Sequence, residues 1–309
     1  MVVDHFTGII CGLHRSGTTY IGKILKYAPD TRVLQEPFNY KYGIEGVPSW
    51  YPYISQSDPD PKVSKLIDIL TRLEGRWSEP EGGEGWRRNI ARLIGNRQQR
   101  RWRLLKVKRV MKKLPRNIIW KDPFCTFMVD YLTRENNFPV VCMIKHPCAF
   151  YYSVKKQNWQ FDVDHLLRQS ALIQRFGSDV SGDVWQLASE NNLLSLSLQW
   201  KLMARVVSRS RHQNKKLLLV RHEDFCNAPE IWIEKICNHL NIPLTQKMLN
   251  YVSKTTRGSV VEGPPGVAEL YERDSNSLQH IWKKNLSVLD QREVLDVVGK
   301  DLQLFYGSN

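Results

Sequence analysis

The sequence predicts an α/β fold in which one parallel β-sheet carries helices on both faces. Five short apolar runs, each of strand length, alternate with stretches in which apolar residues recur at helical spacing. Strands that alternate with helices pair in parallel, and helices on both faces leave such strands buried. The chain has 309 residues, which is enough for one large domain, so we expect a single domain over residues 1–309.

The elements can be placed in order along the chain. Apolar runs predict strands over residues 6–11, 32–34, 117–120, 140–144 and 215–220. Helical spacing predicts helices over residues 20–27, 61–77, 86–111, 127–134, 187–211, 231–240 and 288–305, and another from about residue 149. Residues 40–62 are rich in Pro, Tyr and Gly and are typical of an irregular loop, and residues 79–85 of a flexible turn.

The composition is that of an ordinary globular protein, with 42% hydrophobic and 25% charged residues. No apolar run approaches the ~20 residues of a membrane-spanning helix, and the N-terminus lacks the basic segment of a signal peptide. The six cysteines have neither CxxC pairs nor the spacing of metal sites. We therefore expect a cytoplasmic protein with reduced thiols, without a transmembrane segment and without a bound metal.

The positive charge is concentrated in one segment. The net charge is +14, and residues 97–116 hold ten Lys or Arg and no acid, so the rest has 35 basic against 31 acidic residues, a net of +4. Trp102, Leu105, Val110 and Leu114 are interleaved with the cations, as in an amphipathic helix. One interpretation is a solvated helix face whose apolar side packs on the core. The other is a docking surface for an acidic acceptor or an acidic membrane; we do not expect nucleic acid as a partner.

The loop after the first strand has the arrangement of a phosphate-binding loop. A strand, a glycine-containing loop and a helix aim backbone N–H groups at an anion. Gly12 and Gly17 are separated by four residues, as in a P-loop, but Thr18 and Thr19 stand where a Walker motif has Lys and Ser or Thr. The sheet is therefore predicted to be P-loop-like, with a phosphate site that does not depend on a metal.

The stretch HRSGTT at residues 14–19 resembles the 5′-phosphosulfate loop of sulfotransferases that use 3′-phosphoadenosine 5′-phosphosulfate (PAPS), which has the pattern [K/R]-[S/T]-G-T-T. The resemblance implies that Arg15, Ser16, Gly17, Thr18 and Thr19 bind this donor. It also implies an in-line, metal-independent transfer of a sulfuryl group to an acceptor hydroxyl or amine. The alternative is a helix-capping Ser/Thr turn without a ligand.

A second motif follows the strand at residues 140–144. The family has Arg-x-Pro after a strand and a Ser eight residues beyond the Arg, and both hold the donor's 3′-phosphate. Here Lys145 precedes His146-Pro147, and Ser153 lies eight residues after Lys145. Lys neutralises a phosphate but does not make the bidentate contact of Arg. The alternative is a solvated Lys and a capping hydroxyl.

Later segments also resemble the family. VRHEDF at residues 220–225 is similar to its V-R-Y-E-D-[LF] segment, and WKKNLS at 282–287 to its W-[RK]-x-x-L-S segment. Arg257, before a Gly-Pro-Pro-Gly turn, is a candidate for the loop that closes over the 3′-phosphate. Residues 40–116 match no family motif, and we expect them to be a variable, acceptor-side insertion that contacts an acceptor such as a glycan or another acidic molecule.

Three residues are the candidates for catalysis. Arg15 and Lys121, each after a strand, would neutralise charge on the leaving phosphate. Glu36 is the preferred base, because Glu-Pro follows the second strand, where several family members carry a catalytic Glu. Glu36 as a salt-bridge partner of Arg15 is the alternative, and His14 and His146 are weaker candidates for the base.

Two other functions compete with the transferase. A P-loop kinase or other NTPase would use the same loop, but the Walker Lys is missing and no convincing magnesium-binding Asp follows a strand. A non-catalytic protein that binds a polyanion would account for the charge and predicts steeply salt-dependent binding. The sequence leaves the acceptor and the oligomeric state open.

Overall fold

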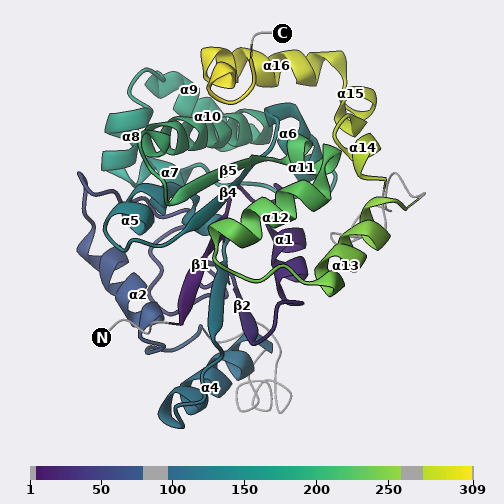
Figure 1. The fold of residues 1–309 in the computed structure, drawn as a ribbon. Coiled ribbons are helices and arrows are strands. Elements are labelled where there is room, and N and C mark those ends of the chain that lie inside the picture. The colour runs from purple at the N-terminus through teal and green to yellow at the C-terminus, as the bar shows by residue number, and fades with distance from the viewer. Residues whose placement is uncertain (1–4, 79–96, 259–273, 308–309) are drawn as a thin grey trace, which may run out of the picture.

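The structure is a computed structural model that describes residues 5–78, 97–258 and 274–307. Its centre is a five-stranded sheet in the order β2-β3-β1-β4-β5, and every neighbouring pair is parallel (Figure 1). The strands are β1 (Phe6–Cys11), β2 (Thr31–Gln35), β3 (Asn117–Lys121), β4 (Val140–Ile144) and β5 (Leu217–Arg221). The predicted α/β class and the parallel sheet are confirmed.

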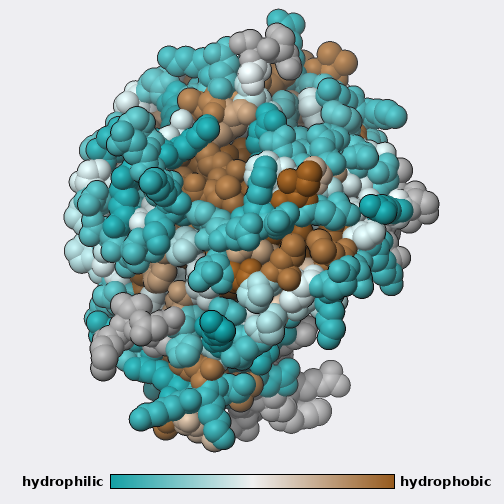
Figure 2. All heavy atoms as spheres, in the orientation of Figure 1, coloured by the Kyte–Doolittle hydropathy of each residue, from teal (hydrophilic) through white to brown (hydrophobic). Residues whose placement is uncertain are grey.

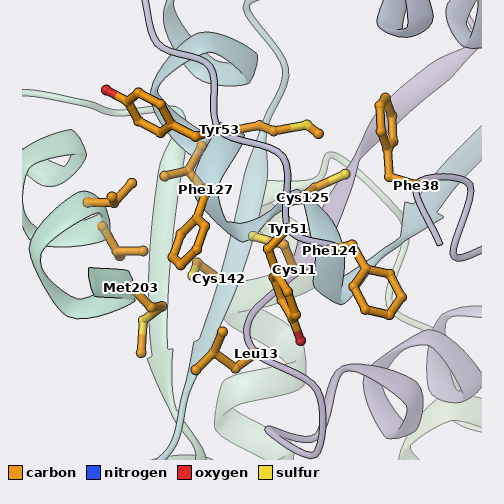
Figure 3. Packing of buried hydrophobic residues seen from close by; sticks show 14 of the residues in the cluster. Cys11, Leu13, Phe38, Tyr51, Tyr53, Phe124, Cys125, Phe127, Cys142 and Met203 are labelled. Atoms are coloured by element: carbon orange, nitrogen blue, oxygen red, sulfur yellow. The ribbon is translucent and has the colours of Figure 1, made fainter. Parts of the chain in front are cut away.

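Both faces of the sheet are buried, which is why its strands are apolar without alternation. In β1, Ile9 and Cys11 belong to one core cluster and Ile10 to the other. The side chains of β4 divide in the same way, with Cys142 on the side of Cys11 (Figure 3). A strand with side chains of period two can be apolar throughout only if helices cover both sides.

Helices fill both layers. The Ile10 face is covered by α1 (Thr18–Leu25), α11 (His222–Asn227), α12 (Pro229–His239) and α13 (Gln246–Thr256). Most of the other helices pack on the opposite cluster: α2 (Pro61–Thr71), α4 (Arg97–Val110), η1 (Pro123–Met128), α5 (Val129–Arg134), α6 (Pro147–Lys155), α7 (Asp164–Leu167), α8 (Ser170–Phe176), α9 (Gly182–Glu190), α10 (Asn192–Arg211), α15 (Ile281–Asn285) and α16 (Val288–Val298). Two short elements, α14 (Ser275–Leu278) and η2 (Gly299–Leu304), complete the described chain.

Some predicted helix boundaries are wrong. The helix expected over 187–211 is two helices, because Asn191 is extended and its side chain accepts a hydrogen bond from the Leu194 N–H, which starts α10. The helix expected over 61–77 ends at Thr71, before Leu73 and Gly75 adopt positive φ. The first part of the helix expected over 86–111 lies outside the described residues, and so does the turn at 79–85.

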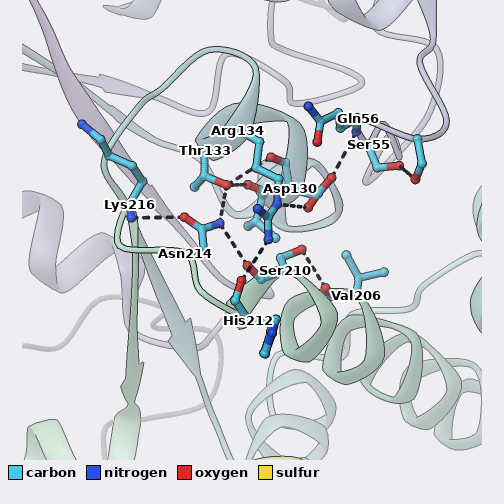
Figure 4. A network of polar contacts seen from close by, with 12 residues as sticks. Ser55, Gln56, Asp130, Thr133, Arg134, Val206, Ser210, His212, Asn214 and Lys216 are labelled. Carbon is cyan, nitrogen blue, oxygen red and sulfur yellow. Dashed lines mark hydrogen bonds and ion pairs between the residues drawn. The ribbon is translucent and has the colours of Figure 1, made fainter.

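A polar cluster fixes the connection between α10 and β5 (Figure 4). The Asn214 amide donates to the Thr133 hydroxyl at 2.8 Å and accepts from the Lys216 N–H at 3.1 Å. Arg134 donates to the His212 carbonyl at 3.0 Å. These bonds satisfy the backbone of the turn that leads into β5 and hold that turn against α5.

The chain passes very close to β4 directly after the end of β1. Gly12, directly after β1, has a φ of 129°, and a Cβ there would lie 2.2 Å from the Met143 carbonyl oxygen of β4. The Gly12 N–H donates to the Thr126 hydroxyl at 3.0 Å. A glycine is required here because no side chain fits and because the backbone is left-handed.

Gly12→Ala is therefore expected to lower the free energy of unfolding by more than about 2 kcal/mol, from the positive φ and the contact with backbone. Urea unfolding would measure the change. Gly182→Ala is the matched control, because nothing lies within 4 Å of a Cβ at Gly182. Equal unfolding midpoints for the two variants would contradict the close approach.

Candidate active site

A cavity of about 920 Å³ lies at the carboxyl edge of the sheet, and residues that follow all five strands contribute to its lining. One part of the lining comes from the loop after β1, the start of α1, α6 and the segment after β5. The other part comes from the segments after β2 and β3 and from residues 156–162. Parallel strands bring such segments together at one edge, which is where ligands of open α/β sheets bind.

The loop after β1 presents the start of α1 to this cavity. Gly17 is the N-cap, with a φ of 101°, and no side chain caps the helix. Gly17, Thr18 and Thr19 all line the cavity, as a phosphate site at a helix N-terminus requires. Ser16 does not: it is buried, and its hydroxyl donates to the Leu13 carbonyl at 2.6 Å, so it holds the turn.

The two predicted phosphate motifs meet in space. Arg15 donates through Nε to the Ser153 hydroxyl at 3.2 Å, and the Lys145 ammonium lies 3.4 Å from the Arg15 carbonyl oxygen. The Arg15 guanidinium also lies over the Trp159 ring, 5.6 Å from its centroid. All four side chains line the cavity. The structure thus brings Arg15 together with Lys145 and Ser153, which lie 130 and 138 residues further along the chain, near the N-terminus of α1.

The cavity lining also includes one member of an ion pair. Lys121 ends β3 with a side chain that is 1% exposed, and its Nζ lies 2.6 Å from Oε1 of Glu36, which is 35% exposed and lines the cavity. Gly22 of α1 leaves room for the lysine stem, since a Cβ there would lie 3.0 Å from Lys121 Cγ. The ion pair of Glu36 is therefore with Lys121, whereas the sequence suggested Arg15 as its partner.

The ion pair sets the charge state of Glu36. Burial by itself raises the pKa of this carboxyl, but the Lys121 ammonium and the hydrogen bonds from Lys121 and Asn39 outweigh burial and hold the pKa below its ordinary value. Asn39 donates to Oε2 at 3.1 Å. The carboxylate is thus held by both oxygens and is ionised at neutral pH.

Asp122 holds two of the segments that line the cavity. It is fully buried, and its two oxygens accept hydrogen bonds from the N–H groups of Phe38 at 2.6 Å and Phe124 at 3.0 Å. Burial raises the pKa of Asp122 to about 7, with the Glu36 carboxylate contributing, against the two N–H bonds. Asp122 is not part of the cavity lining, so it fixes the segments after β2 and β3.

The candidate histidines are neutral and differ in position. Burial, with Arg15 nearby, lowers the pKa of His14 to about 4. Its ring lines the cavity, and its Nδ1 is hydrogen-bonded to the Tyr51 hydroxyl. His146 stacks on Trp282 with ring centroids 4.6 Å apart, outside the cavity lining, and burial lowers its pKa to about 4.

Arg257 is not brought into the cavity. Its side chain is 75% exposed and lies 3.5 Å from the Glu230 carboxylate, at the end of α13. The two preceding residues, Thr255 and Thr256, do line the cavity.

Much of the remaining lining was not predicted. The segments after β2 and β3 and the segment after α6 contribute a wall of aromatic side chains, namely Tyr40, Tyr42, Trp50, Tyr51, Phe124, Trp159 and Phe161. Their signal in the sequence is the density of aromatic residues in the loop at 40–62 and just after α6. His222, next to the end of β5, also lines the cavity, and burial beside Lys145 holds its pKa well below the ordinary value.

The segment at 40–116 contributes to the lining only in part. Among its described residues, those that line the cavity are Tyr40, Lys41, Tyr42, Trp50 and Tyr51. No described residue of the basic stretch at 97–116 lines the cavity.

Two kinds of feature are absent from residues 5–78, 97–258 and 274–307. These residues contain no group of three or more His, Cys, Asp and Glu placed to hold a metal ion. They also contain no helix whose length and apolar character would let it cross a bilayer.

Comparisons with known proteins place the chain in a family. The model of the sulfotransferase family matches residues 9–246, and no curated protein sequence matches the chain. The fold is similar to that of the sulfotransferase domain from the curacin biosynthetic pathway, with 12% identity over 96% of each chain and a TM-score of 0.45. It is also similar to a sulfotransferase domain of the Synechococcus PCC 7002 olefin synthase, with 13% identity over 96% of each chain and a TM-score of 0.44. A mouse sulfotransferase complexed with PAP has 11% identity over 96% of this chain and 83% of its own, with a TM-score of 0.39. Because the family model spans most of the sequence, the chain belongs to the sulfotransferase family.

Proposed function

We propose that this sulfotransferase moves a sulfuryl group from PAPS to a hydroxyl or amine of its acceptor, by in-line displacement and without a metal. One observation supports this above all. A single cavity is lined by an uncapped helix N-terminus with Arg15, Lys145 and Ser153, and by the ionised Glu36. The first group suits a doubly phosphorylated donor, and the second suits an acceptor that must lose a proton.

The donor would be held by two sets of groups. The N–H groups at the start of α1, with Arg15, are suited to the 5′-phosphosulfate, because dipole and cation favour an anion at the same place. Lys145 and Ser153 are suited to the 3′-phosphate. PAPS supplies the activated sulfuryl group, whose bond to the phosphate oxygen breaks as the bond to the acceptor forms. Charge that develops on the phosphate is stabilised by Arg15 and the loop N–H groups.

Glu36 would take the proton from the acceptor. Its carboxylate faces the cavity and is ionised at neutral pH, so it can accept a hydrogen bond from a hydroxyl and then its proton. Lys121 touches Glu36 and is almost fully buried. We assign it the role of orienting the base and of holding it in its charged form.

The acceptor would enter beside the aromatic wall. Tyr40 and Trp159 are 41% and 43% exposed although they are large aromatic residues, and both line the cavity. Exposed ring faces in a cavity favour an acceptor that presents a flat ring or another apolar surface. A screen of hydroxyl and amine compounds with radiolabelled PAPS would identify the class of acceptor from the product that gains sulfate.

The spent donor, adenosine 3′,5′-bisphosphate, is expected to bind in the presence of a chelator. Ser153→Ala should weaken this binding at least about tenfold, because a hydrogen bond to a charged group contributes about 1.5–3 kcal/mol. Titration calorimetry would measure both. Ser189→Ala, on the exposed side of α9, is the matched control. Binding that is absent in chelator and restored by magnesium would contradict the proposal and favour a kinase.

Glu36→Gln keeps the shape of the side chain and removes the base. The turnover number should fall about 10²–10⁴-fold, while the affinity for adenosine 3′,5′-bisphosphate stays within a few-fold. Steady-state kinetics with the acceptor from the screen would test this, with the exposed Glu45→Gln as the control. If Asp122→Asn abolishes turnover and Glu36→Gln does not, the base is Asp122.

The pH dependence of turnover distinguishes Glu36 from Asp122 as the base. With the pKa of Glu36 below its ordinary value, the base is charged at every pH above about 4.5, and its acid limb lies below that pH. Lys121→Met removes the interaction that lowers this pKa, so the acid limb should move to higher pH. A limb near 7 that disappears in Asp122→Asn would belong to Asp122. A profile that is unchanged by Lys121→Met would exclude Glu36 as the titrating base.

A further inference from the structure

Helix α4 has apolar side chains on two opposite faces. Trp102 and Leu105 are buried in the core cluster and fix the inner face of the helix. Gln99 reinforces this attachment by donating to the Ser78 carbonyl at 2.7 Å. The helix is therefore held by the fold, and only its outer half is available to a partner.

The outer face carries a second apolar stripe. Leu104, Val107 and Met111 follow one another at spacings of three and four residues, which places them on one side of a helix, and the Met111 N–H continues the helical turn by donating to the Val107 carbonyl at 3.0 Å. Their exposed fractions are 46%, 52% and 55%, and that of the neighbouring Val110 is 84%. An amphipathic helix of a globular protein normally has polar residues on its outer side.

Cations flank this stripe. Arg100 and Lys112 are exposed and Lys108 is half-buried, and none of these three forms an ion pair within the residues that the structure describes. No acidic residue occurs between residues 97 and 116. The surface formed by Leu104, Val107, Val110 and Met111 with Arg100, Lys108 and Lys112 is called the α4 surface below.

The α4 surface lies away from the active-site cavity, so a partner bound to this surface does not cover the cavity. The chain leaves α4 and enters β3 at its first residue, where the Arg116 and Asn117 N–H groups bond to Asp30 at the start of β2. The helix thus lies at the end of the sheet where the strands begin, opposite the carboxyl edge that bears the cavity (Figure 1). Hydrophobic residues lie among hydrophilic ones at this pole of the molecule (Figure 2).

We propose that the α4 surface docks the protein on a membrane of anionic lipids. Charge alone would suit any polyanion, but a polyanion offers nothing for four exposed apolar side chains to enter. An anionic bilayer matches both halves of the surface, with headgroups for the cations and acyl chains for the apolar stripe. Because its inner face is fixed, α4 cannot be enclosed in a partner's groove, but it can lie in the plane of an interface.

Vesicle co-sedimentation tests the proposal with the full chain. The protein should sediment with vesicles of equal parts phosphatidylserine and phosphatidylcholine and not with pure phosphatidylcholine. Replacing Arg100, Lys108 and Lys112 by Gln should weaken binding by about fivefold per residue, on the order of a hundredfold in all. Replacing Leu104, Val107 and Met111 by Ser should weaken it at least about tenfold with the charges intact.

The matched control is Val288→Ser with Leu289→Ser, which removes two side chains that are 83% and 65% exposed on α16, away from the α4 surface. It should bind vesicles like the wild type, and urea midpoints of all variants should agree. Absence of wild-type binding to the anionic vesicles overturns the proposal. Loss of binding in the Gln variant but not in the Ser variant also overturns it, since the surface would then recognise charge alone, as for heparin.

Discussion

Lys121 is almost completely buried at the end of the central sheet, and its ammonium has to be neutralised there. An isolated charge in the interior costs several kcal/mol, and removing one partner of a buried pair leaves that cost uncompensated. Glu36 provides the neutralising carboxylate at 2.6 Å. The cavity lining therefore includes a carboxylate that is ionised and is held in place by the lysine.

Two residues that line the cavity, Glu36 and Arg15, have unfavourable backbone conformations. Glu36 has a φ of 52° and Arg15 a φ of 66°, conformations that cost on the order of 1–3 kcal/mol each for residues with side chains. Asp122 holds the segment after β2 through the Phe38 N–H, and the Glu36 N–H bonds to the Lys121 carbonyl at 2.8 Å. Hydrogen bonds around Glu36 thus hold one of these two residues, both of which line the cavity, in its unfavourable backbone conformation.

Cations gather at two opposite ends of the central sheet. At the carboxyl edge, Arg15 and Lys145 are gathered with Ser153 in the lining of a cavity. At the amino edge, the cations of α4 are spread along a convex helix beside apolar side chains. A cavity selects a small ligand by its shape, whereas an exposed helix face suits a partner with an extended surface.

The sequence alone was sufficient for the fold class and for the order of the strands along the chain, because apolar runs of strand length are local signals. It also pointed to the loop after β1 and to the Lys145–Ser153 spacing, since each of these two patterns spans only a few residues. Other features depend on contacts between distant segments. The partner of Glu36 is Lys121, 85 residues away, Ser16 turns into the protein, and Arg257 points to Glu230 outside the cavity. The pairing of β3 with both β1 and β2 decides which charges become neighbours at the carboxyl edge, and no spacing along the chain reports that pairing.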